Sequence, residues 1–281
     1  MRIGVTGATG QLGRLAVAAL GRRAPGAEVV ALARDPARAA DIGVAVRRAD
    51  YRDPALLAEA VAGLDVVALI SSNDFDDRAG QHRAVIEAAA AAAVGRIVYT
   101  SILKGEASPL MLAADHVATE AAIGASGLAH TILRNGWYTE NYTAALPGAV
   151  QAGGLIGAAG EGRLSTATRA DYAEALAVAA ADVAPGNRVH ELAGDTGWTM
   201  AELAQEVSRA TGRQIGYTDM TPEAYAAALS GFGLPEPAAR AIADADGHAR
   251  DGALHDAGGT LSALIGRPTT PLAAAVEEAL R

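Results

Sequence analysis

The fold is decided by the stretch Val5-Thr6-Gly7-Ala8-Thr9-Gly10-Gln11-Leu12-Gly13, which joins a short apolar segment to a helical pattern. Its glycines have the spacing G-x-x-G-x-x-G, which differs from the commoner G-x-G-x-x-G fingerprint of dinucleotide-binding loops. The physical requirement is the same, because small residues let the backbone approach a pyrophosphate that helix N–H groups and the helix dipole stabilise. The order of strand, turn and helix therefore predicts a dinucleotide-binding loop.

Short β-branched segments alternate with helical patterns along the first half of the chain. Asp35-Pro36 and Asp53-Pro54 each offer a capping acid followed by proline, which is typical of a helix start. Such alternation predicts a Rossmann-type doubly wound α/β fold, a parallel sheet whose ligands bind at the carboxyl ends of its strands. The strands are expected at residues 3–6, 28–33, 44–49, 66–70, 97–101 and 129–133.

The alternation fades after about Tyr142, and a smaller, mainly helical C-terminal part is expected. We predict a dinucleotide-binding domain over residues 1–145 and a smaller part over residues 146–281 that returns elements to the sheet, with substrate between the two. The elements expected in this part are a helix after residues 168–171, a strand over 188–192, a helix from the capping box at 199–202, and a surface loop, or alternatively a mobile lid, over 245–252.

Composition excludes several classes of function. The net charge of −9 and the pI near 5.1 argue against a nucleic-acid partner, which needs clustered Lys and Arg. The absence of cysteine excludes disulfides, thiolate nucleophiles and cysteine-ligated zinc. The N-terminus shows no signal peptide, and the longest alanine-rich run, residues 87–95, is too short to span a bilayer. We expect a cytoplasmic protein without a membrane span, a monomer or a homodimer.

The residues that end the expected strands indicate which cofactor binds. Arg34 follows the second strand, where an acid usually binds the ribose of NAD and an arginine accommodates the 2′-phosphate of NADP. Asp35 is already explained as a helix cap, so Arg34 favours NADP(H). Asp50 follows the third strand and is expected at the adenine end. The serines that end strands four and five, expected nearer the nicotinamide, are Ser71, Ser72 and Ser101.

Ordinary short-chain dehydrogenases carry a Tyr-x-x-x-Lys pair on a helix, and this chain lacks it. Lys104 is the only lysine and lies five residues from Tyr99, which is in a strand. The helix that should carry the pair has Leu112 and His116 in those positions. His116 either holds the nicotinamide ribose or delivers a proton, or it is an ordinary partly buried histidine.

Two further patterns bear on the site. The remaining histidines have no metal-ligand spacing, so we predict no metal. Three aromatic residues lie within Leu133–Tyr142, in a chain that has only two tryptophans and two phenylalanines. They predict a ring-stacking wall at the end of the sixth strand, with core packing as the alternative.

Motifs over nearly the full length are similar to the NmrA-like branch of the atypical short-chain dehydrogenases. Within that branch the chain resembles the bacterial NADPH-dependent quinone oxidoreductases that need neither flavin nor zinc. The segments that carry the resemblance are Gly7–Gly13, Arg34–Pro36, Ala49–Tyr51, Tyr99–Ser101, Arg134–Tyr138, Glu140–Tyr142, Ala167–Tyr172, Leu192–Asp195 and Leu264–Gly266.

The resemblance implies hydride transfer from NADPH to a small-molecule quinone, a two-electron reduction to hydroquinone. It implies a catalytic role for His116 or Tyr138 and substrate contacts from Trp137, Tyr138 and Asn141. The residues expected to bind the cofactor through the resemblance are Thr6, Gly7, Thr9, Gly10, Gln11, Leu12, Gly13, Arg34, Asn135 and Gly136. A missing tyrosine suits this chemistry, because a reduced quinone leaves as a comparatively stable phenolate.

Two other functions stay open. NmrA-like proteins include NADP-binding redox sensors and regulators without turnover, and the missing Tyr-x-x-x-Lys pair fits these equally well. Reduction of triphenylmethane dyes is the other alternative, since the same hydride attacks any planar electrophile of similar size. The resemblance around Trp137 favours the enzyme.

Overall fold

The computed structural model describes residues 1–184 and 186–281, and its chain divides into two compact units. The sheet unit comprises Met1–Glu106, Ala114–Asn135 and Arg169–Leu192. The second unit comprises Ala107–Ala113, Gly136–Thr168 and Ala193–Arg281. Packing thus assigns residues 169–192 to the sheet unit and residues 136–145 to the second unit, whereas the sequence suggested one boundary between 145 and 146.

The sheet unit contains a seven-stranded parallel sheet in the order β3-β2-β1-β4-β5-β6-β8. The chain reverses direction across the sheet between β1 and β4, and this switch point is where doubly wound folds bind dinucleotides. The order confirms the Rossmann-type fold class, and the later strand β8 lies in the same sheet beside β6. The strands are β1 (Arg2–Val5), β2 (Glu28–Ala33), β3 (Ala45–Arg48), β4 (Val66–Leu69), β5 (Arg96–Ile102), β6 (Ala129–Asn135) and β8 (Arg188–Leu192).

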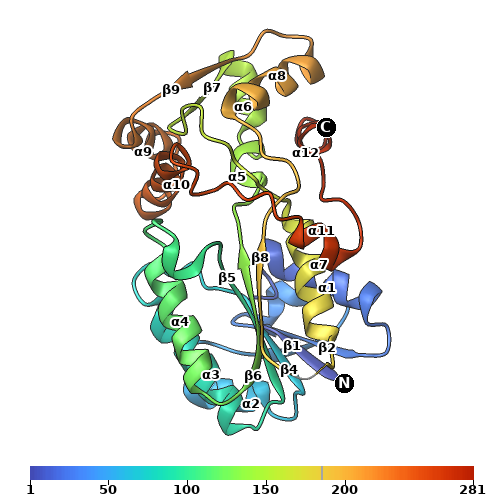
Figure 1. The fold of residues 1–281 in the computed structure, drawn as a ribbon. Coiled ribbons are helices and arrows are strands. Elements are labelled where there is room, and N and C mark those ends of the chain that lie inside the picture. The colour runs from blue at the N-terminus through green and yellow to red at the C-terminus, as the bar shows by residue number, and fades with distance from the viewer. Residues whose placement is uncertain (185) are drawn as a thin grey trace. The chain divides into compact units, whose positions relative to one another are not determined.

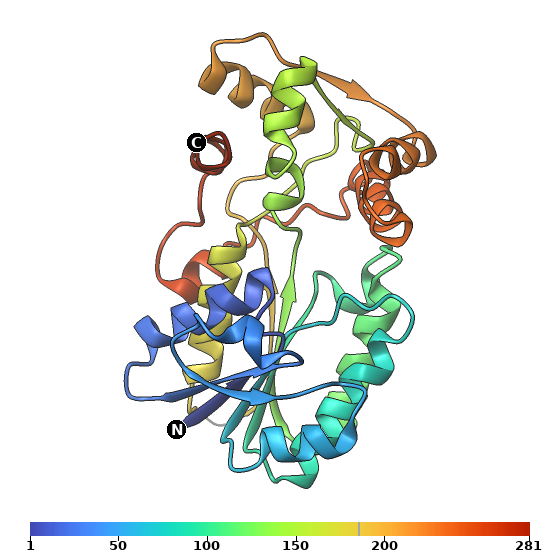
Figure 2. The same cartoon turned by 180° about the vertical axis from the view of Figure 1, so that it is seen from behind.

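Helices cover both faces of this sheet, α1 and α7 on one and α2, α3 and α4 on the other (Figures 1 and 2). The predicted caps are confirmed: Asp35 Oδ1 accepts from Ala37 N at 3.1 Å, and Asp53 Oδ1 accepts from Ala55 N at 3.0 Å. The helices are α1 (Gln11–Arg23), α2 (Pro54–Val61), α3 (Arg78–Ala91), α4 (Ala113–Ala125) and α7 (Arg169–Ala181), with short 3₁₀ turns η1 (Pro36–Ala39) and η2 (Gly105–Ala107).

The core of the sheet unit explains why its strands read as continuous apolar runs. All four residues of β4 and all seven of β5 are buried, as expected for strands covered on both faces. Leu57, Val85 and Ile97 belong to one apolar cluster between the sheet and the helices α2 and α3. This packing fixes the strand ends from which the site is built.

The second unit is mainly helical and also holds a small parallel sheet of β7 (Gly154–Gly157) and β9 (Gly216–Asp219), which the sequence did not predict. The capping box is confirmed, because the Thr199 side chain accepts from Glu202 N and the Glu202 side chain accepts from Thr199 N. Its helices are α5 (Glu140–Thr143), α6 (Leu146–Ala152), α8 (Met200–Thr211), α9 (Pro222–Gly231), α10 (Glu236–Ala249), α11 (Thr260–Ile265) and α12 (Leu272–Ala279).

The prediction of a loop over residues 245–252 is wrong for residues 245–249, since α10 continues to Ala249. Asp246 is fully buried and accepts hydrogen bonds from Tyr142 Oη at 2.8 Å and Ala158 N at 3.0 Å. The acidic and glycine residues suggested a turn, but burial of the alanine-rich face overrides their low helix propensity.

Two kinds of feature are absent from the described part of the chain. No helix there is long and apolar enough to cross a membrane. No group of three His, Asp or Glu side chains there has a geometry that would hold a metal ion.

Candidate functional site

The glycine loop after β1 has the shape that a bound pyrophosphate requires. Gly7 has φ +58°, a left-handed conformation that glycine adopts without strain. A Cβ on Gly13 would lie 2.2 Å from Gly7 O, so α1 packs directly on the loop backbone. Gly10, which caps α1, provides no side chain, and the first turn has no acidic residue. The helix start is therefore open to an anion, and the loop fits a dinucleotide.

Arg34 follows β2 as an exposed side chain. It forms no hydrogen bond or ion pair with the described residues, while its neighbour Asp35 is occupied as the cap of η1. An exposed side chain without such contacts is available for a ligand, and the assignment of Arg34 to the 2′-phosphate stays a prediction. Asp50 after β3 is partly occupied, because its Oδ1 accepts from Arg52 N at 3.0 Å.

The turn after β4 is fixed from behind by side chains. Ser71 N donates to Thr100 Oγ1 at 2.9 Å, and Ser72 N donates to His82 Nε2 at 2.9 Å. Arg78 Nε donates to Ser72 O at 2.7 Å. The backbone polar groups of Ser72 are thus both held by residues of α3, which orients the turn that we predict to face the nicotinamide.

A buried polar network lies behind this turn. Tyr99 in β5 is fully buried, and its hydroxyl lies 2.7 Å from His116 Nδ1. His82 Nδ1 lies 2.9 Å from Thr119 Oγ1. Because His82 Nε2 accepts from Ser72 N, the proton of this imidazole is on Nδ1. No pattern in the sequence predicted this network.

Burial sets the charge of these histidines. Desolvation, followed by the positive charge of Arg78, lowers the pKa of His82 to about 3. The same two causes, together with His82, lower the pKa of His116 to about 3. Desolvation raises the pKa of Tyr99 above its ordinary value. His116 is 8% exposed and neutral at pH 7, so it does not act there as an imidazolium acid.

A charged ladder crosses β5, β6 and β8 on the face that α4 covers. Ser101, Arg134 and Glu191 are register partners. Arg134 donates to both carboxylate oxygens of Glu120 on α4, at 3.0 and 2.7 Å, and to Glu191 at 2.9 Å. The Ser101 hydroxyl also donates to Glu120. Ser101, predicted to end its strand and face the cofactor, instead lies inside β5 with its hydroxyl bound within the protein.

The charged ladder also fixes the segment after β5. Lys104 N donates to Glu191 Oε2 at 2.7 Å. A Cβ on Gly105 would lie 2.4 Å from Arg134 Cζ, so only glycine fits against the guanidinium. Hydrogen bonds to the two glutamates raise the pKa of Arg134 above its ordinary value. No sequence motif indicated this ladder, because its members are far apart in the chain.

Asn135 at the end of β6 has an amide without a partner. The residue is 4% exposed, and neither Oδ1 nor Nδ2 has a hydrogen bond within the described structure. Its carbonyl accepts from Leu103 N at 2.8 Å, which fixes the backbone. A buried amide in this state needs a ligand or water, and its place at a strand end fits the nicotinamide portion of a dinucleotide.

The aromatic segment after β6 belongs to the second unit. Gly136, Trp137, Tyr138 and Asn141 are all half-buried. Trp137 O accepts from Ala167 N at 3.2 Å, and Thr139 N donates to Ala167 O at 3.0 Å, so this backbone is held in a strand-like pairing. The Trp137 indole Nε1 is buried and has no hydrogen-bond partner in residues 1–184 and 186–281.

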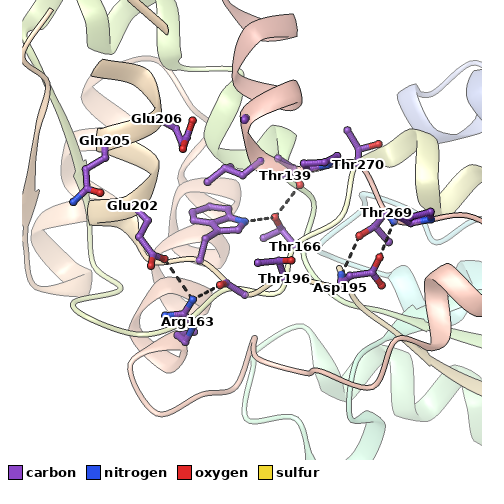
Figure 3. A pocket seen from close by; sticks show the side chains of 16 residues that line it. Thr139, Arg163, Thr166, Asp195, Thr196, Glu202, Gln205, Glu206, Thr269 and Thr270 are labelled. Carbon is purple, nitrogen blue, oxygen red and sulfur yellow. Dashed lines mark hydrogen bonds and ion pairs between the residues drawn. The ribbon is translucent and has the colours of Figure 1, made fainter. Parts of the chain in front are cut away.

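A cavity of about 460 Å³ lies within the second unit (Figure 3). Hydrogen bonds join its polar walls: Asp195 N donates to Thr269 Oγ1 at 2.9 Å, and Thr269 N donates back to Asp195 Oδ2 at 2.8 Å. Arg163 pairs with Glu202 at 3.5 Å. None of the predicted site residues lines this cavity, and the sequence did not predict it.

A family model described as NAD(P)H-binding matches residues 7–183. The chain belongs to this family. The match confirms the predicted class of cofactor, a nicotinamide dinucleotide.

The relatives extend over the whole chain. It is 47% identical over 277 residues to Quinone oxidoreductase 2 of Escherichia coli (strain K12), covering 98% of this chain and 97% of that protein. The crystal structure of the Escherichia coli NADPH-dependent quinone oxidoreductase QOR2 with NADPH is similar with a TM-score of 0.95 and 46% identity, covering 99% of this chain and 100% of that one. Citrobacter sp. triphenylmethane reductase with NADP(H) has a TM-score of 0.93 and 34% identity, covering 99% of each chain. The predicted resemblance is confirmed, while the individual site residues stay predictions.

Proposed function

We propose that this chain is an NADPH-dependent oxidoreductase that reduces small quinones to hydroquinones. The observation that carries the proposal is the 47% identity, over nearly the full length of both chains, to Quinone oxidoreductase 2 of Escherichia coli. The open glycine loop and the unpartnered amide of Asn135 support it, because both are features that a bound dinucleotide would complete. In the same proposal the protein acts in the cytoplasm as a monomer or homodimer.

The residues of this chain hold the cofactor at three places in the proposal. The loop Gly7–Gly13 takes the pyrophosphate, Arg34 takes the 2′-phosphate, and Asn135 takes the nicotinamide end. When bound, NADPH supplies a hydride to the quinone, and the accompanying proton comes from water. Asp50 at the adenine end and the turn at Ser71–Ser72 complete the site.

In the proposal the protein orients the cofactor and the quinone and does not provide a strongly acidic side chain as proton donor. Leu112 and His116 stand where other short-chain dehydrogenases have tyrosine and lysine, and His116 is neutral because its pKa is about 3. Its Nδ1 is hydrogen-bonded to the Tyr99 hydroxyl at 2.7 Å, which fixes the orientation of the ring. In the proposal His116 positions the cofactor, Tyr138 contacts the quinone, and water supplies the proton. Reduction of a quinone does not require a strong acid in the site, since the reduced oxygen is a stable phenolate.

Dye reduction is the second candidate function. The 34% identity and TM-score of 0.93 to the Citrobacter triphenylmethane reductase favour it specifically. Hydride addition to a dye cation requires no proton donor, which again suits a site without the Tyr-x-x-x-Lys pair.

The proposal is tested by NADPH oxidation at 340 nm with benzoquinone, naphthoquinone and a triphenylmethane dye, with NADH in parallel. We expect quinone-dependent oxidation that prefers NADPH. Oxidation with the dye alone would make the protein a dye reductase. Tight NADPH binding without oxidation by any acceptor would refute an enzyme and favour a redox sensor that acts through a protein partner.

A further inference from the structure

The only two tryptophans in the chain differ in what their indole N–H groups contact. Trp198 is 5% exposed, and its Nε1 donates to Thr166 Oγ1 at 3.1 Å. Its ring meets Tyr142 edge-on, with ring centroids 5.2 Å apart. The N–H of Trp198 is therefore satisfied, and its ring packed, inside the second unit.

Trp137 has no such internal explanation. Its Nε1 is buried without a hydrogen-bond partner among the described residues, although the residue itself is half-buried. Its backbone is fixed by pairing with Ala167. Buried donors in folded proteins nearly always have partners, so an orphaned one in a fixed segment indicates a missing ligand or water.

The chemistry of the indole restricts what that ligand is. An indole N–H is a donor only, and its ring is a flat apolar surface. The complementary ligand is planar and presents an acceptor oxygen. Trp137 follows Asn135, whose amide we assign to the nicotinamide end, by two residues along the chain.

We propose that Trp137 Nε1–H donates a hydrogen bond to a carbonyl oxygen of the quinone, an inference that rests on the proposed function. In the reaction the C4–H bond of NADPH breaks, and its hydride, with both electrons, passes to the quinone. Negative charge develops on the quinone oxygen, and water supplies one proton, so that NADPH, quinone and H⁺ give NADP⁺ and hydroquinone. The indole keeps its own proton, and its hydrogen bond strengthens as that charge develops.

The substitution Trp137→Phe tests this role, because it removes the N–H and keeps an aromatic ring. The loss of one hydrogen bond of this kind is expected to lower kcat/KM for naphthoquinone about tenfold. The affinity for NADPH, measured by calorimetry, is expected to stay within about twofold. The quinone Kd on the NADP⁺-loaded protein, where no reduction takes place, should weaken in the same direction as kcat/KM.

The matched control is Trp198→Phe, which removes the indole N–H already satisfied by Thr166. It should leave the quinone kcat/KM within about twofold, with any cost in thermal stability instead. Trp137→Phe that binds NADPH and keeps both its quinone kcat/KM and its quinone Kd would overturn the proposal. A wild-type protein without quinone turnover would refute the proposed function separately, and the calorimetric quinone Kd of the two proteins would still decide on Trp137.

Discussion

Arg134 and Asn135 are neighbours in β6, yet they differ completely in their contacts. Arg134 is half-buried under α4, where Glu120 and Glu191 occupy its guanidinium. Asn135 is equally part of a strand, but its amide has no partner. Adjacent strand residues point to opposite faces, so one sheet carries a closed polar interior and an open polar edge side by side.

The comparison separates structural from ligand-binding polar residues. Closed groups such as Tyr99 and Arg134 have partners within the protein and contribute to its stability. Open groups such as Arg34 and Asn135 have no partners among the described residues, and this costs stability where the group is buried. Substitutions in the two regions should therefore change stability and cofactor affinity differently.

Acid should produce the largest effect, and it acts on the closed region. The folded-state pKa of about 3 for His82 and for His116 lies below the ordinary value of 6.5. Between these values the unfolded chain binds more protons, so the free energy of unfolding decreases as the pH falls below 6.5. Each histidine contributes up to about 1.4 kcal/mol per pH unit in that window. Urea unfolding at pH 7, 6 and 5 measures this slope.

The double variant His82→Gln, His116→Asn isolates the contribution of the two histidines. The amides of Gln and Asn are expected to take over the hydrogen bonds of His82 Nε2 and His116 Nδ1 without titrating, so the slope should flatten. His248→Gln is the control, because His248 is 40% exposed on α10. Equal slopes for wild type and double variant would show that the closed region is not the source of acid sensitivity.

Arg34→Ala tests the open edge at the second strand. The loss of charge-assisted hydrogen bonds to a 2′-phosphate should weaken NADPH binding about tenfold to a hundredfold, while NADH, which lacks that phosphate, is little affected. Calorimetric titration with both cofactors measures the difference. Arg48→Ala, another arginine at the end of a neighbouring strand, is the control. Equal losses for NADPH and NADH would contradict the assignment.

The open residues at the strand ends could largely be predicted from the sequence, whereas the closed residues could not. Local signals located the open edge: the spacing Gly7–Gly13, the caps Asp35 and Asp53, and the β-branched strands whose ends are Arg34 and Asn135. Each of these depends on residues close together in the chain. General rules for parallel sheets then predicted the doubly wound fold.

The closed interior could not be predicted in this way, because its partners meet only in the folded sheet. Arg134 is 57 residues from Glu191, and nothing in the sequence pairs them. Ser101 was mistaken for an open residue for the same reason, since Glu120 on α4 takes up its hydroxyl. His82 likewise showed no signal that it would hold the backbone of Ser72.

Glu120→Gln should destabilise the closed interior. The amide carries no charge and has one acceptor oxygen in place of two, so part of the pairing with Arg134 and Ser101 is lost. Hydrogen bonds between charged groups contribute about 1.5–3 kcal/mol each, and we expect the free energy of unfolding to fall by about 2 kcal/mol. NADPH affinity should stay within about twofold. Glu59→Gln on the exposed face of α2 is the control, expected within about 0.5 kcal/mol of wild type.

Asn135→Leu should change the free energy of unfolding least, and should raise it where Glu120→Gln lowers it. Leucine has a similar shape and removes a buried amide that has no partner in the free protein. The free energy of unfolding without cofactor should therefore rise by about 1 kcal/mol, as relief of an unsatisfied polar group predicts. NADPH binding should weaken in the same protein, because the cofactor loses the amide. Urea unfolding with and without NADPH measures both changes. A variant that loses stability without cofactor would mean that the amide already has a partner, such as a bound water, and that Asn135 belongs with Arg134 among the closed residues.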